Sequence, residues 1–226
     1  MNKEEKLSWL NSYLIKASTK NEWYDSEIPP IVNQVIQGSK DLNIYPYALF
    51  YKVQSDYYNL SLGERKLLLD APSTHHLCKS VLFENTKWKS RKFPNHDNSD
   101  FSNQDYIDDY LNWDYPRYTL VLVQYTDKIN TKKFNQYMRN LSKLSSKQIN
   151  MRVTSEEVAV RLTGYSMGGV TPFGMNEKVP VIITENITKL EPHVMFLGAG
   201  DPDWKVSIPV EELKMALNAV VVDLAE

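Results

Sequence analysis

The sequence is poor in cysteine. Cys78 is the one cysteine among 226 residues, which excludes an internal disulfide and a four-cysteine zinc site. The four histidines are scattered, and the sequence contains neither H-E-x-x-H nor a paired C-x-x-C. We therefore predict no metal site and expect no cofactor. A single thiol is also typical of a reducing compartment, so we expect a cytoplasmic protein.

Long apolar runs are also missing. Nowhere do about 18 apolar residues follow one another, so no membrane span is predicted. The amino-terminal sequence is charged and amphipathic, and it lacks the apolar core of a signal peptide. The formal net charge of −2 excludes a polycation that binds nucleic acid or anionic membranes in bulk, although a local basic face remains compatible with it.

Glycine is scarce and unevenly placed. The chain has eight glycines, and four of them lie in the stretch "TGYSMGGVTPFG" at 163–174. This stretch is neither G-x-G-x-x-G nor a phosphate loop ending in Gly-Lys-Ser/Thr, so it predicts no nucleotide site. Two interpretations remain open. The stretch forms a tight turn, or it forms a pocket wall in which Gly168 and Gly169 let a ligand approach backbone amides and Pro172 stiffens the far end.

The hydrophobic pattern predicts helices and strands that are interleaved without strict alternation. We expect an α/β or α+β fold with a mixed, mostly antiparallel sheet or a partly closed barrel. Leu7, Leu10 and Leu14 form the predicted apolar stripe of the first helix, Gly38 ends the second, and Thr154 with Glu157 matches a capping box. The predicted helices cover 4–16, 26–38, 61–70, 130–141, 154–162 and 209–217, and the predicted strands cover 45–53, 76–84, 117–125, 179–187, 193–200, 204–208 and 219–225.

Residues 86–116 differ in composition from the rest of the chain. They are rich in Asn, Asp and Ser, and they contain no sustained apolar run. A strong strand follows at once, so this segment is predicted to be an insertion between two strands. A helix is expected within it around 106–113.

Lys79 lies in the middle of an apolar strand, where lysine is unusual because it is rarely buried without a partner. Side chains alternate along a strand, so Lys79 and Cys78 face opposite ways. We interpret Cys78 as a small buried residue. The alternative is a cysteine nucleophile with His75 or His76 as its base, and it remains open from the sequence.

The segment 128–152 carries seven basic residues and no acidic one. This pattern favours a polyanionic partner such as RNA, contacted through its phosphates. The alternative is a solvated helix face. The basic residues are Lys128, Lys132, Lys133, Arg139, Lys143, Lys147 and Arg152.

Three stretches together resemble a known family. They are "CKSVLF", "RLTGYSMGGVTPFG" followed by "VPVIIT", and "GAGDPDWKVSIPVEELKMALNAVVVDLA". They resemble the YbaK family of prolyl-tRNA-synthetase-associated editing domains, which deacylate mischarged tRNA. The resemblance covers roughly 30–226. It implies an editing domain at 28–226, interrupted at about 86–116, with a helical extension at 1–27.

The resemblance also implies a site and a reaction. The strand lysine of the family falls on Lys79, and its Gly-x-x-x-Pro element falls on Gly168 to Pro172. A metal-independent hydrolysis of the ester in a mischarged tRNA is implied, most familiarly tRNA(Pro) carrying Ala or Cys. The partners implied are this tRNA and an aminoacyl-tRNA synthetase, with no membrane or DNA. The expected site residues are Lys79, Gly168 and Gly169 for catalysis, and Val170, Thr171, Pro172, Leu197, Gly198 and Gly200 for substrate binding, with Lys128, Lys132, Lys133 and Arg139 contacting RNA.

Leu197 departs from the family pattern, because many relatives carry a small polar residue there. The departure leaves the identity of the amino acid open. Two alternatives to a free-standing deacylase also remain. One is a non-catalytic module that binds tRNA or a synthetase on the same fold, and the other is the amino-terminal editing domain of a larger prolyl-tRNA synthetase.

Overall fold

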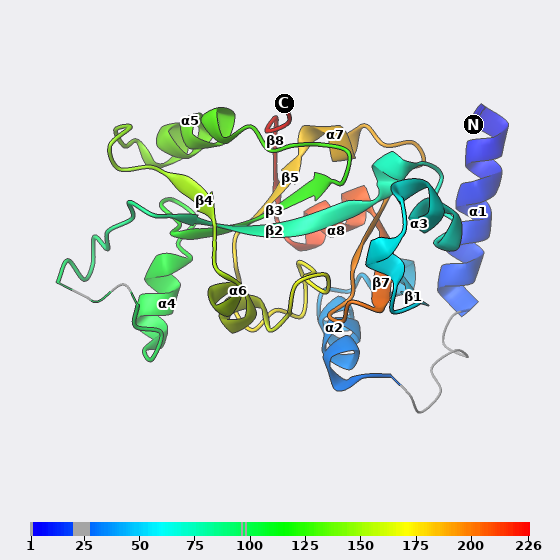
Figure 1. Ribbon diagram of the computed structural model, residues 1–226, viewed down its shortest axis with the longest axis horizontal. Helices are drawn as coiled ribbons and strands as arrows, with labels where there is room; N and C mark the ends of the chain where they lie inside the picture. Colours follow the sequence, from blue (N-terminus) through cyan, green and yellow to red (C-terminus); the bar gives the residue numbers. More distant parts are fainter. Residues whose placement is uncertain (1, 20–27, 96, 98) are drawn as a thin grey trace.

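The strands of the computed structural model, which describes residues 2–19, 28–95, 97 and 99–226, form two sheets (Figure 1). One sheet has five strands in the order β4-β2-β3-β5-β8, and the other has three in the order β1-β7-β6. The strands are β1 (Leu49–Lys52), β2 (Cys78–Asn85), β3 (Tyr118–Gln124), β4 (Met151–Val153), β5 (Val181–Thr184), β6 (Val194–Gly198), β7 (Trp204–Pro209) and β8 (Val220–Val222).

The larger sheet is mixed. β2 pairs antiparallel with β3 from Cys78 opposite Gln124 to Glu84 opposite Tyr118, whereas β3–β5 and β5–β8 pair in parallel. The smaller sheet is antiparallel throughout, and an isolated bridge between Leu77 and Phe196 joins it to the larger one. The predicted mixed α/β class is confirmed, and the described strands close no barrel.

The helices cover both faces of the larger sheet. Figure 1 shows α5 and α7 above it and α4, α6 and α2 below it. Among the described residues, none of the helices has both the length and the apolarity that a bilayer span requires. The helices are α1 (Lys3–Thr19), α2 (Pro30–Asp41), α3 (Leu62–Leu68), α4 (Gln104–Tyr110), α5 (Thr131–Ser142), α6 (Glu156–Thr163), α7 (Glu185–Thr188) and α8 (Val210–Ala216).

Two helix ends differ from prediction. Gly38 does not end α2, which continues to Asp41. A Cβ on Gly38 would lie 2.3 Å from the backbone nitrogen of Gly174, so glycine is needed there for close packing rather than for a helix stop. The amino-terminal cap of α6 is Ser155, whose side chain accepts a hydrogen bond from the Val158 amide, and the predicted capping box starting at Thr154 is wrong.

The first helix is present as predicted, but the residues that it buries differ from the predicted apolar stripe. Leu7 and Leu14 are exposed, whereas Tyr13 and Ala17 are buried. The Tyr13 hydroxyl donates to the carbonyl oxygen of Tyr47 at 2.7 Å, which fixes this face against the body of the protein. The predicted domain boundary after residue 27 and the predicted start of the second helix at residue 26 both lie outside the described residues.

Residues 45–47 form a 3-10 turn rather than strand, and β1 begins only at Leu49. Pro46 stands in this turn, where its fixed φ is compatible with the backbone. The three-residue strand β4 was not predicted. It is too short for its alternation to be recognised from sequence, and it forms because Met151 pairs with Asn85 at the end of β2.

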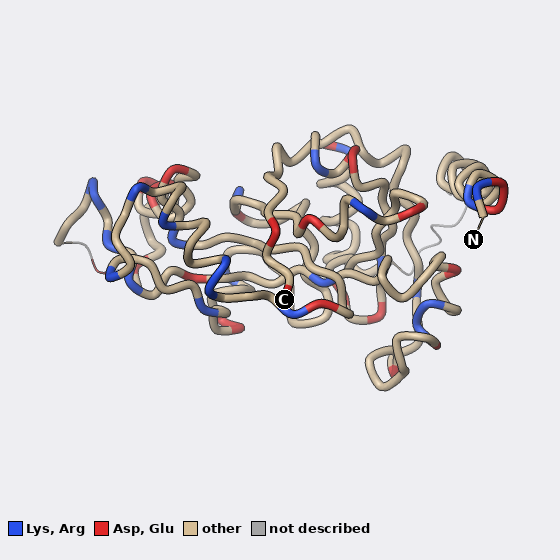
Figure 2. The backbone as a smooth tube through the Cα atoms, turned by 90° about the horizontal axis from the view of Figure 1, so that it is seen from above, with Lys and Arg blue, Asp and Glu red and all other residues tan. Residues whose placement is uncertain are grey.

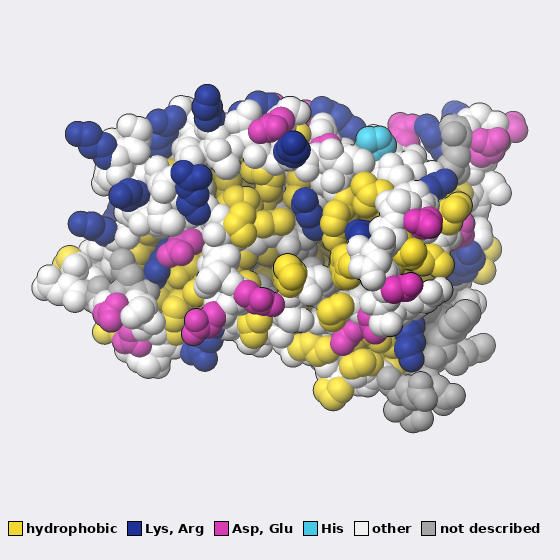
Figure 3. All heavy atoms as spheres, in the orientation of Figure 1, with side chains coloured by type: hydrophobic (Ala, Val, Ile, Leu, Met, Phe, Trp, Pro, Cys, Tyr) yellow, Lys and Arg dark blue, Asp and Glu magenta, His cyan; other side chains and the backbone are white. Residues whose placement is uncertain are grey.

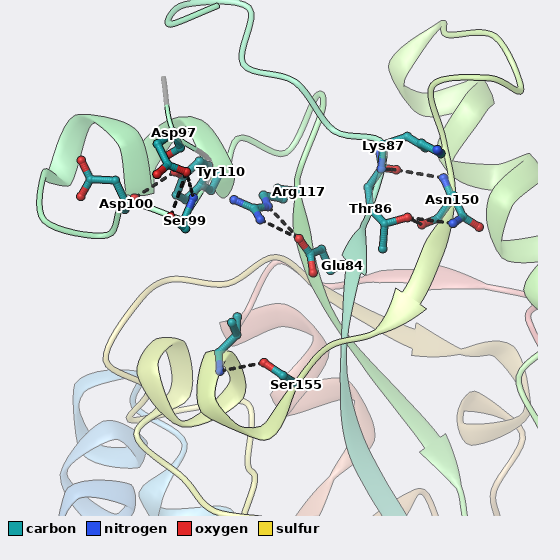
Figure 4. A network of polar contacts seen from close by, with 12 residues as sticks. Glu84, Thr86, Lys87, Asp97, Ser99, Asp100, Tyr110, Arg117, Asn150 and Ser155 are labelled. Carbon is teal, nitrogen blue, oxygen red and sulfur yellow. Dashed lines mark hydrogen bonds and ion pairs between the residues drawn. The ribbon is translucent and has the colours of Figure 1, made fainter. Parts of the chain in front are cut away.

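The predicted insertion connects β2 to β3 and contains α4, as expected. Its scattered aromatic residues nevertheless reach the main core, because Trp88, Tyr110 and Tyr115 are all buried. An ion pair of 2.7 Å between Arg117 and Glu84 ties the end of this connection to β2 (Figure 4). The described part of the connection is therefore a packed element of the fold rather than a surface appendage.

Candidate functional site

A cavity of about 320 Å³ lies where the two sheets meet. Its walls come from β2, from the end of β6, and from the glycine-rich loop that follows α6. Figure 3 shows apolar side chains gathered over the middle of this face of the molecule. A concave, largely apolar hollow with a few polar groups is the usual form of a small-ligand site.

Lys79 lines this cavity from β2. Its ammonium nitrogen lies 5.4 Å from the centre of the Tyr125 ring. Among the described residues, no side chain forms an ion pair or a hydrogen bond with this ammonium. The ion pairs of the described chain join other residues. On the opposite side of the strand Cys78 is 3% exposed and packs in the main core. The Lys79 charge is therefore available to an anionic group in the cavity.

One further cation lines this cavity and another packs on two tyrosines of its wall, and sequence reasoning missed both. Lys205 of β7 lines it and is 4% exposed, with its ammonium 4.7 Å and 4.8 Å from the ring centres of Tyr57 and Tyr58. Burial lowers the pKa of Lys205 to about 8. Arg65 of α3 stacks on the same two rings at 5.2 Å. Lys205 could have been found from the sequence, because it stands between Trp204 and Val206 in a predicted strand. This is the pattern of a lysine within an apolar strand that identified Lys79.

Both of these cations are engaged by the backbone. The Lys205 ammonium donates to the carbonyl oxygens of Pro202 and Trp204 at 2.6 Å and 3.2 Å. The Arg65 guanidinium donates to those of Leu60 and Tyr58 at 3.0 Å and 2.7 Å. These two residues hold the walls of the cavity, whereas Lys79 is the cation left without such acceptors among the described residues.

Tyr58 connects this cluster to the glycine-rich loop. Its hydroxyl donates a 2.6 Å hydrogen bond to the carbonyl oxygen of Gly168. Burial raises the pKa of Tyr58, which keeps the hydroxyl protonated and able to donate. The hydrogen bond from Tyr58, which stands in the opposite wall of the cavity, thus fixes the orientation of the Gly168 carbonyl.

The glycine-rich loop packs against another backbone. The Gly200 amide donates to the carbonyl oxygen of Gly169 at 2.8 Å. A Cβ on Gly169 would lie 2.3 Å from the Gly200 oxygen, and one on Gly198 would lie 2.8 Å from the carbonyl carbon of Gly169. Close contact with the end of β6 thus accounts for glycine at these positions.

The structure brings five of the expected catalytic and substrate-binding residues to the cavity. Four others are not among its lining residues. Gly169 and Gly200 are buried in their mutual contact, Thr171 is fully buried, and Pro172 lines a separate hollow beside α2. The five that line the cavity are Lys79, Gly168, Val170, Leu197 and Gly198.

The loop also limits which backbone amides can bind a ligand. The amide of Gly169 donates to the carbonyl oxygen of Ser166 at 3.1 Å and is therefore occupied. The amides of Gly168 and Val170 find no acceptor in the described part of the chain. These two donors, rather than the Gly169 amide, are the ones that could face a developing negative charge.

Cys78 is among the residues that line the cavity, but its burial and the surroundings of His76 disfavour the cysteine alternative. Burial raises the pKa of the Cys78 thiol, which disfavours the thiolate. His76 hydrogen-bonds through Nδ1 to Ser73 at 2.9 Å and through Nε2 to the Pro192 carbonyl at 3.0 Å, so both its ring nitrogens are engaged. Within the described ranges, no group of three His, Cys, Asp or Glu side chains could hold a metal ion.

The expected RNA-contacting residues fall into different surroundings. Lys128 and Lys132 are exposed, whereas Lys133 pairs with Asp223 at 2.8 Å near the carboxyl-terminal end. Arg139 is half-buried and hydrogen-bonded to Gln136. The structure therefore does not present these four side chains as one set of free cations.

Comparisons with known proteins bear on the fold. The structure is similar to a candidate trans-editing enzyme for prolyl tRNA synthetase, with 17% identity, a TM-score of 0.65, and coverage of 88% of this chain and 99% of that one. It is also similar to a scaffold protein used for epitope grafting (16%, TM-score 0.63, 88% and 99%) and to a hypothetical protein (16%, TM-score 0.59, 85% and 99%). At these identities the likeness shows the fold alone.

The sequence comparison adds a family match for part of the chain. Residues 114–216 match the family model described as the aminoacyl-tRNA editing domain. This segment runs from just before β3 to the end of α8, and it includes the glycine-rich loop and Lys205. The resemblance inferred from the sequence is confirmed over residues 114–216, where this chain is similar to the aminoacyl-tRNA editing domain.

Proposed function

We propose that this protein is an aminoacyl-tRNA deacylase that acts in trans and removes a small amino acid from a mischarged tRNA. One observation carries the proposal. Lys79 stands without an anionic partner among the described residues, in the same cavity as the Gly168 turn. A cation and fixed amide donors around an apolar hollow suit a reaction in which negative charge develops on a carbonyl oxygen.

The proposed reaction is hydrolysis of the ester between the amino acid and the terminal ribose of the tRNA. The oxygen of a water molecule attacks the ester carbonyl, and the tetrahedral oxyanion is stabilised by the amides of Gly168 and Val170. The bond from carbon to the ribose oxygen then breaks, and a proton from the water passes to that oxygen. The products are the free amino acid and a tRNA with a free hydroxyl.

Lys79 is proposed to bind the terminal phosphate or to stabilise the oxyanion. Leu197 is 1% exposed and lines the apolar part of the cavity, where it would contact the amino-acid side chain. A volume of about 320 Å³ is at the small end for ligand sites, which supports a small amino acid such as Ala or Cys. We propose tRNA(Pro) as the tRNA, by analogy with the description of the similar structure.

The domain assignment belongs to the same proposal. We propose that residues 28–226 form the editing domain, with 86–116 as its insertion and 1–27 as an extension. The second candidate function is a module that binds tRNA or a synthetase without catalysis. One observation favours this non-catalytic module. The hydrogen bonds within the glycine-rich loop leave fewer backbone amides free than an oxyanion hole with every loop amide available would have.

A deacylation panel tests the proposal. The purified protein is incubated with tRNA(Pro) and other tRNAs charged with Ala, Cys, Ser or Pro, and the remaining ester is measured. We expect hydrolysis of a mischarged tRNA(Pro), and its loss in Lys79→Ala while tRNA binding persists. Hydrolysis of no substrate by the wild type, with tRNA still bound, would favour the non-catalytic module.

A further inference from the structure

A second hollow, away from the cavity, is lined by basic side chains. It measures about 780 Å³ and lies between the segment that follows β2 and the segment that precedes β4. Lys87, Lys89 and Arg91 line one wall, and Lys147 lines the other. We call these four residues and the hollow between them the basic groove. No acidic residue is among its described lining residues.

The two walls of the basic groove are held together by the polypeptide itself. The Asn85 side chain donates to the carbonyl oxygen of Gln148 at 3.0 Å and accepts from the Asn150 amide at 2.9 Å. The Asn150 side chain donates to the Thr86 hydroxyl at 2.7 Å, and Figure 4 shows Thr86 and Lys87 beside Asn150. The spacing of the two backbone walls is therefore set before a ligand binds, which reduces the entropy cost of binding.

The cations of the basic groove are exposed and free of acids. Lys87, Lys89 and Lys147 are exposed, and none of the ion pairs of the described chain includes them. The Arg91 guanidinium lies 4.7 Å from the ring centre of Tyr115, which positions it at the groove. Four cations without counter-charges create a local positive potential on a chain whose net charge is −2.

The distribution of charged residues over the molecule also indicates a positive potential around the basic groove. Figure 2 shows Lys and Arg concentrated at the end of the molecule that holds α5 and the connection from β2 to α4. Figure 3 shows basic side chains gathered there on the same face as the central apolar area. From Lys79 to Asn85, β2 extends over about 20 Å along the strand, and Lys87 lies in the turn that follows.

We propose that the basic groove binds the phosphate backbone of the tRNA whose charged end occupies the cavity, an inference that rests on the proposed function. An RNA helix presents rows of phosphates, and Lys and Arg side chains bind them without reading sequence. The groove is concave and exposes no large apolar side chain, whereas insertion into a lipid surface needs an exposed apolar face. The predicted insertion thereby acquires a role, because it supplies three of the four cations.

The test compares two variants with the same change of charge. The groove variant is Lys87→Gln/Lys89→Gln/Lys147→Gln, and the control is Lys3→Gln/Lys40→Gln/Lys178→Gln, whose positions are exposed but lie outside the groove. Binding of uncharged tRNA is measured from 50 to 200 mM salt. We expect the groove variant to bind at least tenfold more weakly, with a slope of log K against log salt that is shallower by about three. The control should retain wild-type affinity within about threefold.

Direct binding separates this inference from the proposed function. A wild type that hydrolyses no ester but binds tRNA through the groove supports the inference and overturns the deacylase. Equal loss of affinity in both triple variants, or equal tRNA binding by wild type and groove variant, overturns the inference whatever the hydrolysis result. Loss of binding to phosphatidylserine vesicles alone, with tRNA binding unchanged, also overturns it and assigns the groove to an anionic membrane. Because all six substituted lysines are exposed, circular dichroism should show both variants folded.

Discussion

The hydroxyl of Tyr58 donates a hydrogen bond of 2.6 Å to the carbonyl oxygen of Gly168, across the cavity between the two sheets. The backbone of Tyr58 is itself held by Arg65, whose guanidinium donates to the Tyr58 carbonyl at 2.7 Å. The orientation of the loop peptide thus depends on a chain of contacts that begins on α3. Tyr58 is a positioning residue in this arrangement.

Tyr58→Phe should therefore slow hydrolysis more than it weakens the fold. Loss of one buried hydrogen bond costs about 1 kcal/mol of unfolding free energy, but a Gly168 peptide that is free to rotate no longer directs its neighbouring amides. We expect a single-turnover deacylation rate about tenfold or more below wild type, with KM little changed. The measurement is single-turnover hydrolysis beside a thermal melt.

Tyr51→Phe is the matched control for this prediction. Its hydroxyl hydrogen-bonds to Ser207 at 3.0 Å and does not line the cavity. A similar loss of stability with an unchanged rate is expected. A wild-type rate in Tyr58→Phe would show that the hydrogen bond to Gly168 does not orient the loop for catalysis.

Gly169→Ala should destabilise the protein. The new Cβ would stand 2.3 Å from the Gly200 oxygen, so two backbone segments must separate. We expect a loss of roughly 1–3 kcal/mol in the free energy of unfolding, measured by urea denaturation. Gly63→Ala is the control, because its Cβ in α3 would meet only the Ser61 hydroxyl at 3.8 Å, and alanine there should stabilise by about 0.5–1 kcal/mol. Equal stability of the two variants would contradict the close contact.

Cys78 should resist alkylation in the native protein. It is 3% exposed, and burial raises the pKa of its thiol, so both access and thiolate are lacking. Iodoacetamide labelling followed by mass spectrometry should detect modification in urea but not under native conditions. Met167→Cys gives a positive control, because Met167 is 80% exposed. Rapid native labelling of Cys78 would reinstate the cysteine-nucleophile hypothesis.

His76 should make stability depend on pH in mildly acidic solution. Burial lowers the pKa of His76 to about 4, so the unfolded chain binds a proton at a higher pH than the native one does. The free energy of unfolding should fall as pH falls from about 6.5 towards 4, by at most about 1.4 kcal/mol per pH unit from this group. Urea denaturation at several pH values measures this slope. The slope should be shallower in His76→Gln, and identical slopes would show that His76 is not responsible.

Local sequence patterns were sufficient to predict most helices and strands, because amphipathic periodicity and capping residues act within a few positions of the chain. They identified the strand of Lys79 and the helix that precedes the glycine-rich loop. The first helix was located correctly, but its buried side could not be deduced. Leucine at helical spacing predicted a stripe through Leu7 and Leu14, whereas the body of the protein packs against Tyr13.

The candidate site was only partly predictable, because its remaining parts depend on long-range contacts. Arg65 appears in sequence as one charge on an exposed-looking helix, and only the tertiary fold places it against Tyr57 and Tyr58. Lys205 is similar, since burial between sheets determines its role. The partner of the glycine-rich loop, at Gly198 and Gly200, comes from a strand about thirty residues later in the chain, and no local pattern reveals such a pairing.

The contact between Gly38 and Gly174 has a consequence for selectivity. Helix α2, the glycine-rich loop and the end of β6 meet through backbone atoms, where no rotamer change can create space. The loop wall of the cavity is thus as stiff as the main chain that forms it. An enzyme built in this way would discriminate between amino acids by excluding those that are too large, because it could not reshape this wall around them.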